Sequence, residues 1–232
     1  MENTQNHESQ QGTQFPLIGT RAPEFKAKTT HGEMHFPNDY EGRWVILFSH
    51  PADFTPVCTT EFITFASRFD EYQALNTDLV GLSIDSVTSH MGWVDSIKSI
   101  EWDGHKNVNI PFPIIDDVKR EVANKYGMLQ GESDTATVRA VFFIDPESKI
   151  RTILYYPAAL GRNFDEIHRI LIGLQKADKD KVALPADWKP GKDVILPPPG
   201  TMADVPERLA LDGKDGHEVK NWYLTFKKDK ED

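Results

Sequence analysis

The order of apolar and polar positions along the chain predicts strands that alternate with helices. Three short, continuous apolar runs bounded by polar turns predict buried strands at residues 44–49, 79–84 and 138–144. A fourth strand is predicted at residues 150–156, and the short turn before it makes the last two strands a hairpin. Uninterrupted apolar runs of this kind are typical of strands that are covered on both faces.

Helical patterns lie between and after these strands. Aromatic residues recur at helical spacing and predict a helix that begins near Pro56 and turns one aromatic face toward the core. Another helix is predicted to begin at Asn163, because Glu166 follows three residues later as in a capping box. Weaker helical patterns cover residues 86–100 and 118–126. The aromatic positions of the first helix are Phe62, Phe65, Phe69 and Tyr72.

This order of elements predicts an α/β fold with a mixed central sheet flanked by helices, and it fits the thioredoxin-like topology. Composition places that domain at residues 15–176, after a polar leader of residues 1–14 that we expect to be disordered. Residues 177–200 hold five of the 15 prolines and predict a linker or arm. Residues 201–232 are too few to bury a core alone, so we expect a C-terminal extension that packs on the main domain or on a second subunit.

Charge and hydropathy narrow the classes of function. The chain has 232 residues, and its 36 acidic against 26 basic side chains give a net charge of −10. This balance argues against nucleic-acid binding. The apolar runs are far shorter than the roughly 18 residues of a membrane-spanning helix. Because the first twenty residues also lack the pattern of a signal peptide, we expect a cytoplasmic protein.

A single cysteine, Cys58, limits the chemistry further. The chain can form no internal disulfide, no CxxC redox pair and no cysteine zinc cage. With Thr55 as N-cap and Pro56 at the first helical position, Cys58 falls in the first turn of a helix. The unpaired N–H groups and the dipole of that turn stabilise a thiolate.

The helix start alone is too weak to ionise a thiol. It contributes about 0.3–1 kcal/mol, whereas an ordinary thiol with a pKa near 8.5 is only about 3% thiolate at pH 7. A cation is therefore needed near Cys58. Arg139 and Arg162 stand at predicted strand and helix ends from which either could reach the sulfur. Glu61 lies one turn along the same helix face and would oppose the thiolate, so we expect an arginine to pair with it.

The residues around Cys58 resemble those of the peroxiredoxins, in particular the one-cysteine branch similar to peroxiredoxin 6. The resemblance rests on Pro-x-x-x-Thr-x-x-Cys, which begins at Pro51, within the longer stretch of residues 48–61. It continues through Arg139 and residues 156–166, and then through residues 185–191. In all, it spans residues 15–228.

The resemblance implies a thiol peroxidase of thioredoxin-like fold that reduces hydrogen peroxide and organic hydroperoxides. Cys58 would be the peroxidatic cysteine, which peroxide oxidises to a sulfenic acid. Thr55 would bind the peroxide and the thiolate, and Pro51 would shield the sulfur from water. Arg139 would stabilise the thiolate and polarise the breaking O–O bond. Matching positions place His50 beside the pocket and make Arg162 a second cation.

The same resemblance implies no metal and no organic cofactor. Because the chain lacks a second cysteine, an external thiol must reduce the sulfenic acid, whether glutathione, a thioredoxin-type protein or another donor. A homodimer is expected, and some relatives join dimers into rings. Mammalian members of this branch carry a Gly-Asp-Ser-Trp-Gly stretch, for which residues 41–45 here read Glu-Gly-Arg-Trp-Val. Without the serine we expect no lipase activity.

Several alternatives stay open at this point. Cys58 could pass oxidation to a partner protein as a redox sensor or relay, or a ring of subunits could act as a holdase without the thiol. His50 could bind a backbone carbonyl, and both arginines could be structural ion-pair partners. His31 and His35 differ in order from the zinc-binding H-E-x-x-H pattern and are predicted in a turn and a strand rather than at a metal.

Overall fold

A computed structural model describes residues 15–129, 131 and 135–229 of the chain. The predicted leader, residues 1–14, lies outside the described residues. Contacts divide the chain into two compact units, one ending at Arg162 and the other beginning at Asn163. No helix in the described part of the chain is long and apolar enough to cross a membrane.

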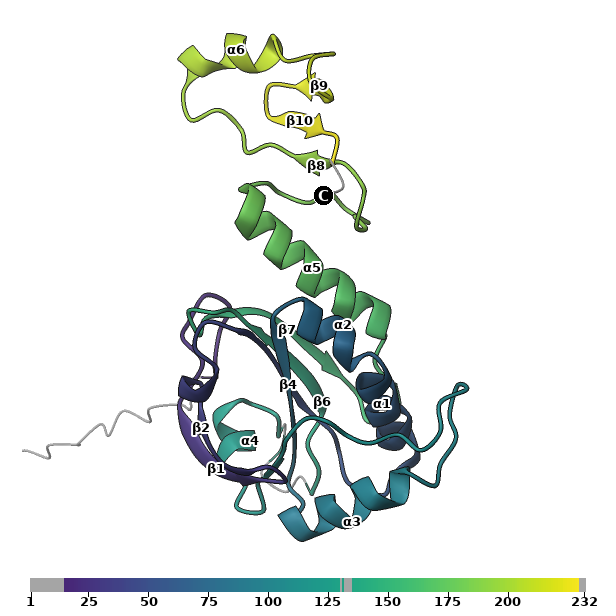
Figure 1. The fold of residues 1–232 in the computed structure, drawn as a ribbon. Helices are drawn as coiled ribbons and strands as arrows, with labels where there is room; N and C mark the ends of the chain where they lie inside the picture. The colour runs from purple at the N-terminus through teal and green to yellow at the C-terminus, as the bar shows by residue number, and fades with distance from the viewer. Residues whose placement is uncertain (1–14, 130, 132–134, 230–232) are drawn as a thin grey trace, which may run out of the picture. The chain divides into compact units, whose positions relative to one another are not determined.

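The N-terminal unit is built on a seven-stranded mixed sheet with the order β2-β1-β5-β4-β3-β6-β7 (Figure 1). β4 pairs in parallel with both β3 and β5, whereas the other pairs are antiparallel. The predicted mixed sheet and the predicted hairpin of β6 and β7 are confirmed. The strands are β1 (Phe25–Thr29), β2 (Gly32–Phe36), β3 (Trp44–Ser49), β4 (Thr77–Ser83), β5 (Ile114–Asp116), β6 (Arg139–Ile144) and β7 (Ile150–Tyr156).

Helices cover both faces of this sheet, with α1 and α4 on opposite sides of β4 and β6 (Figure 1). Successive side chains of β3 point to opposite faces of the sheet. Because both faces are covered, every residue of that strand is buried. Val45 and Leu47 join the core cluster that contains Val122 of α4. Phe48 points to the other face and stacks on Phe65 of α1, with 4.2 Å between ring centroids. The helices are α1 (Pro56–Ser67), α2 (Phe69–Ala74), α3 (Val87–Ile97) and α4 (Glu121–Lys125), with a 3-10 turn η1 (Asn38–Tyr40).

The aromatic helix predicted from Pro56 is in fact two helices, since the backbone leaves helical geometry at Arg68 (φ −103°, ψ 11°). Hydroxyl groups near the break donate to backbone carbonyls of the preceding turn, from Thr64 to Thr60 and from Ser67 to Thr64. Side-chain bonds of this kind bend and weaken helices. The apolar spacing continued across the break and concealed it.

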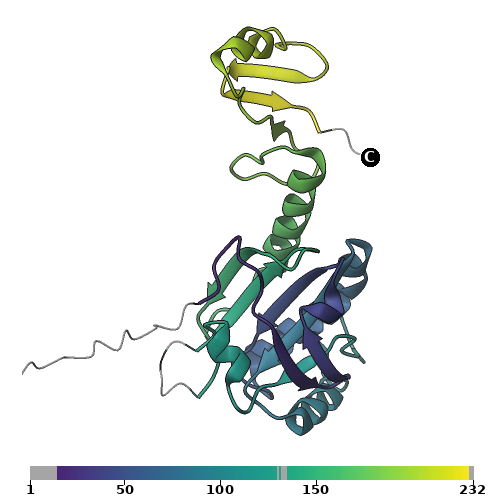
Figure 2. The same cartoon turned by 90° about the vertical axis from the view of Figure 1, so that its left-hand side faces the viewer.

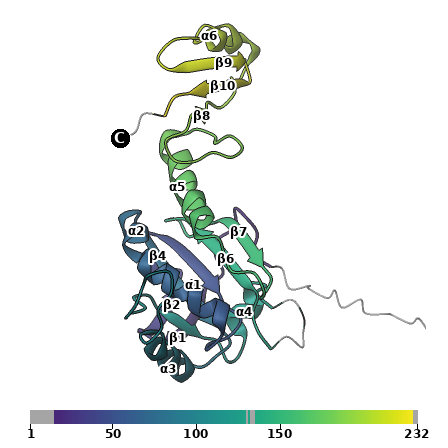
Figure 3. The same cartoon turned by 90° about the vertical axis from the view of Figure 1, so that its right-hand side faces the viewer.

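The C-terminal unit begins with α5 (Phe164–Asp180), whose N-cap Asn163 accepts a hydrogen bond from the Glu166 amide, as predicted. A small antiparallel sheet follows in the order β8-β10-β9 (Figure 2). Its elements are β8 (Val194–Ile195), η2 (Met202–Asp204), α6 (Val205–Leu209), β9 (His217–Asn221) and β10 (Leu224–Lys227). α6 lies along β9 (Figure 3).

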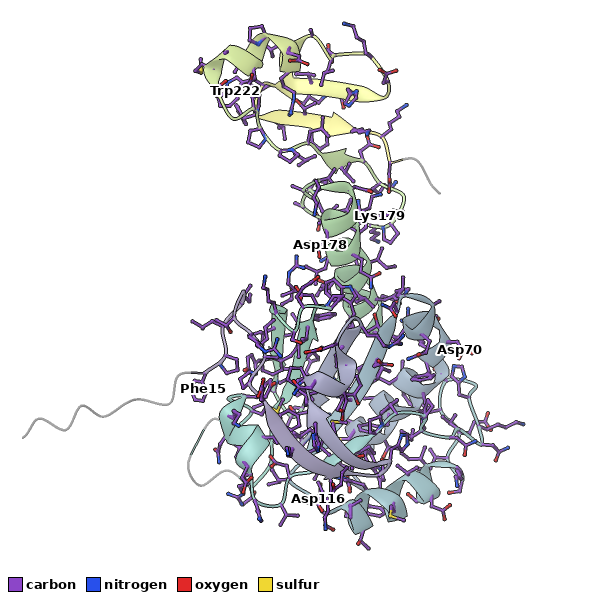
Figure 4. The ribbon with its side chains drawn as sticks, turned by 60° about the vertical axis from the view of Figure 1, so that its left-hand side comes forward. Phe15, Asp70, Asp116, Asp178, Lys179 and Trp222 are labelled. Carbon is purple, nitrogen blue, oxygen red and sulfur yellow. The ribbon has the colours of Figure 1, made fainter. Side chains whose placement is uncertain are left out.

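The tryptophans of this unit lie in different surroundings. The predicted linker or arm contains the buried Trp188, whose indole N–H donates to the Lys192 carbonyl. β10 begins only at Leu224, because Trp222 and Tyr223 form the turn between β9 and β10. Figure 4 labels Trp222 at this turn. Both turn aromatics are exposed.

Candidate active site

Cys58 lies in the first turn of α1, which begins at Pro56 as predicted, and its side chain has no exposed surface. Thr55 is the N-cap residue but does not cap the helix with its side chain. Its hydroxyl donates instead to the Ala52 carbonyl at 2.8 Å, which leaves the lone pairs of the hydroxyl free to accept a bond. Pro51 is buried at the start of the same loop.

Arg139 brings a guanidinium directly to the sulfur. It is the first residue of β6, and its Nη1 lies 3.2 Å from Cys58 Sγ and 2.7 Å from Glu61 Oε2. Nε and Nη2 both donate to the Ala158 carbonyl, at 3.1 and 2.7 Å. The guanidinium is therefore fixed on two sides, with one N–H group directed at the sulfur.

Glu61 pairs with both arginines, where the sequence led us to expect at least one. Arg162 donates to the Glu61 carboxylate through Nε and Nη2, at 3.0 and 2.6 Å. The backbone N–H of Arg162 donates to the same carboxylate at 2.8 Å. The remaining Arg162 nitrogen, Nη1, donates to the carbonyls of Ser49 and Ala140. All three charged side chains are at most 3% exposed.

The charges of the two arginines and Glu61 do not cancel. Two guanidinium groups and one carboxylate leave one positive charge next to Cys58. Burial raises the pKa of Glu61, but Arg162 and Arg139 outweigh it and hold the pKa below its ordinary value. The carboxylate therefore stays charged at neutral pH.

His50 follows β3 and is fully buried. Its ring stacks on Trp93, 5.0 Å between centroids, and meets the edge of Phe62 at 4.7 Å. Its Nε2 lies 2.9 Å from Asp53 Oδ1, and burial lowers the pKa of His50 despite this carboxylate. His50 thus shares a buried polar cluster, and its ring bonds to no backbone carbonyl of the described residues.

Sequence reasoning missed Asp53 and His90, which complete that cluster. His90 on α3 lies 2.9 Å from Asp53 Oδ2 through Nδ1. Asp53 falls inside the stretch that carried the family resemblance, whereas His90 is 37 residues farther on and has no signal in the local pattern. Three or more His, Cys, Asp or Glu side chains could hold a metal if their ligand atoms lie close together. Among the described residues, only His50, Asp53 and His90 meet this condition, with ligand atoms within 4.8 Å of one another. His31 and His35 lie in a turn and in β2.

Comparison with known proteins agrees with this arrangement. Residues 18–153 match the AhpC/TSA family, and residues 173–209 match the C-terminal domain of 1-Cys peroxiredoxin. A peroxiredoxin of Methanosarcina mazei is 58% identical over 217 residues, which is 93% of this chain and 99% of the relative. The chain is a peroxiredoxin. A peroxiredoxin of Aquifex aeolicus is 47% identical, over 92% of this chain and 97% of its own.

Solved peroxiredoxin structures show the same fold. The yeast mitochondrial 1-Cys peroxiredoxin superposes with a TM-score of 0.79 at 39% identity, over 92% of this chain and 99% of that one. A cysteine-to-serine mutant of peroxiredoxin 6 of Arenicola marina gives 0.81 at 34% identity, over 93% and 99%. The thioredoxin-like fold is confirmed, with its mixed sheet and C-terminal extension. The predicted activity, that of a one-cysteine thiol peroxidase, is also confirmed. These relatives favour it over the relay and holdase alternatives.

The Glu61 cluster makes stability depend on pH in a definite direction. Because the folded pKa of Glu61 is depressed, its ionised form stabilises the fold above the unfolded pKa of about 4.3. That contribution is lost as the pH falls through the folded value. We expect Glu61→Gln to lose on the order of 3 kcal/mol at pH 7, and its stability to change less than that of the parent chain below about pH 4.

Urea unfolding at a fixed protein concentration, followed at pH 7 and pH 3.5, measures this. Glu71→Gln, on an exposed carboxylate, is the matched control and should change stability by less than about 0.5 kcal/mol. Equal losses for the two variants at pH 7 would contradict the assignment.

Proposed function

We propose that Cys58 is the peroxidatic nucleophile of this peroxiredoxin. The thiolate attacks the terminal oxygen of the hydroperoxide, so that an S–O bond forms while the O–O bond breaks. The sulfur is oxidised to a sulfenic acid, and the departing oxygen takes up a proton and leaves as water or an alcohol. The observation that carries this proposal is the 3.2 Å contact between Arg139 Nη1 and Cys58 Sγ.

The surrounding residues divide the work. Arg139 stabilises the thiolate and then the negative charge that develops on the leaving oxygen. Glu61 and Arg162 act through Arg139. The Glu61 carboxylate accepts from the Arg139 guanidinium and offsets its charge, and Arg162 holds that carboxylate in place. Thr55 accepts the hydrogen bond of the incoming hydroperoxide, and Pro51 keeps water from the sulfur. Hydrogen peroxide and organic hydroperoxides share the O–O–H group that these residues recognise.

An external thiol closes the cycle. It attacks the sulfenic sulfur, water leaves, and a mixed disulfide forms; a second thiol then releases Cys58. We propose glutathione or a thioredoxin-type protein as the donor, since the yeast mitochondrial relative resolves its thiol through the glutathione and thioredoxin systems. Because thiols are kept reduced in the cytoplasm, we also propose that compartment.

We propose that the protein works as a homodimer, and that dimers can join into a ring. The C-terminal unit supports this assembly, since it is small and exposes several large apolar side chains. Apolar surface of this kind marks an interface. The exposed residues are Met202, Leu209, Trp222 and Tyr223.

The nucleophile and its cation are tested by substitution. With excess dithiothreitol, we expect Cys58→Ser to abolish peroxide consumption. Arg139→Gln should lower kcat/KM by about 10²- to 10³-fold, the range found for the loss of one transition-state hydrogen-bond donor. Arg21→Gln is the control, because Arg21 is half-exposed and pairs only with surface glutamates in the described structure. A Cys58→Ser variant that consumes peroxide at the parent rate would sink the proposal.

The donor is tested by mass spectrometry after one equivalent of hydrogen peroxide. Glutathione added next should give a mixed disulfide on Cys58, which a thioredoxin-type protein or more glutathione then reduces. Protein that has not met peroxide is the control and should stay unmodified. If neither donor regenerates the thiol, the donor belongs to another class.

Analytical ultracentrifugation tests the assembly. The full chain should sediment as a dimer or a multiple of dimers at micromolar concentration. A chain that ends at residue 200, and so lacks the proposed dimerisation extension, should dissociate to monomers at the same concentration. A monomeric full chain would refute the proposed homodimer.

A further inference from the structure

β3 is apolar at every position but its last, where Ser49 is fully buried. A buried hydroxyl group is costly unless it is hydrogen-bonded, so its partners show what it does there. Ser49 Oγ donates to the Val138 carbonyl at 2.5 Å and accepts the Ala140 N–H at 3.1 Å. The hydroxyl therefore binds the main chain of the residues at the start of β6.

These two bonds hold the peptide groups on either side of Arg139. The Val138 carbonyl belongs to the peptide bond before Arg139, and the Ala140 N–H belongs to the one after it. Because each peptide group is planar, fixing both of them fixes the two backbone dihedral angles of Arg139 and the direction in which its side chain leaves the backbone. One buried hydroxyl thus sets the starting point of the guanidinium that lies 3.2 Å from Cys58 Sγ.

The hydroxyl extends the junction of the two strands. The paired positions of β3 and β6 end one residue before Ser49. Beyond them, Thr137 supplies a second buried hydroxyl, which donates to the His50 carbonyl at 2.7 Å. Side-chain bonds made by both chain segments therefore continue the junction up to and past Arg139.

Ser49 also contacts the second guanidinium. Arg162 Nη1 donates to the Ser49 carbonyl at 3.1 Å and to the Ala140 carbonyl at 3.3 Å. The bond between the Ser49 hydroxyl and the Ala140 N–H joins the same two residues. Ser49 therefore holds main chain that orients both arginines, whose guanidinium groups donate to Glu61.

We propose that Ser49 and Thr137 are positioning residues of the peroxidase site, because their hydroxyl groups hold the main chain from which Arg139 reaches Cys58. Both act through the guanidinium, which stabilises the thiolate and the leaving oxygen. This inference rests on the proposed roles of Cys58 and Arg139. Loss of either hydroxyl leaves a buried main-chain group without its partner, and that group regains one only if the strand ends move.

The variants Thr137→Val and Thr137→Ser test the hydroxyl. Valine keeps the shape of threonine but lacks the hydroxyl, whereas serine keeps the hydroxyl but lacks the methyl group. With hydrogen peroxide and excess dithiothreitol at pH 7, we expect Thr137→Val to lower kcat/KM about 10- to 100-fold, since a displacement of about 1 Å costs up to about 100-fold. Thr137→Ser should stay close to the parent kcat/KM.

The dependence of kcat/KM on pH separates positioning from a loss of stability. A misplaced guanidinium stabilises the thiolate less, so the acid limb of the profile should move to higher pH in Thr137→Val. Thr77→Val is the matched control, because Thr77 is also buried and its hydroxyl also donates to a backbone carbonyl, that of Leu75. Thr77 lies opposite Trp44, at the other end of β3 from Ser49. We expect the control to lower the urea midpoint by a similar amount and to leave the pH profile unchanged.

Ser49→Ala removes both bonds beside Arg139 and should lower kcat/KM at least as far as Thr137→Val does. Either variant, if it folds and keeps the parent kcat/KM and pH profile, would overturn the proposal. When Cys58→Ser has abolished peroxide consumption, such a result refutes only the positioning role and leaves the nucleophile in place. Should neither variant fold, Thr137→Ser decides: an unshifted profile supports the role of the hydroxyl, and a shifted one contradicts it.

Discussion

A single buried charge balance organises the proposed active site of this peroxiredoxin. Two guanidinium groups, from Arg139 and Arg162, share one carboxylate, Glu61, and the positive charge left over faces Cys58. Removing one partner from such a buried pair typically lowers the free energy of unfolding by about 3–5 kcal/mol. The positions of the four groups therefore depend on one another. Arg162 is also stacked on Phe48, with its guanidinium carbon 5.1 Å from the ring centroid, which fills the space around the charge with apolar atoms.

The register of the sheet positions Arg139 beside Cys58. β3 and β6 are antiparallel with Phe48 opposite Val141, so the start of β6 stands beside the end of β3. Ala140 and Phe142 belong to the core cluster on the α4 side, which puts Arg139 on the α1 side by alternation. A slip of one residue would turn the guanidinium to the wrong face of the sheet. The tight apolar packing of both faces therefore protects the chemistry as well as the fold.

The sequence predicts the parts of this molecule whose signal is local. The first apolar run predicts β3 with its observed ends, the hairpin pattern predicts those of β7, and the Thr-Pro pair predicts the start of α1. The sequence does not predict the helix break at Arg68, because the aromatic spacing continues through it. It does not predict β5 either, because that strand has only three residues. Strand and helix ends suggested which arginines could reach Cys58. Both arginines bind Glu61, from 78 residues away along the chain for Arg139 and 101 for Arg162. No periodicity in the sequence encodes a contact at such a separation.

The same limit hid His90, and its chemistry shows why a distant residue matters to a local motif. The Asp53 carboxylate lies 2.9 Å from both His50 Nε2 and His90 Nδ1, so it links the end of β3 to α3. All three side chains are at most 1% exposed, and removing one of them leaves a buried polar group without its partner. The loop that begins at Pro51 is therefore held by a residue 37 positions after Asp53, and its geometry depends on α3 as well as on α1.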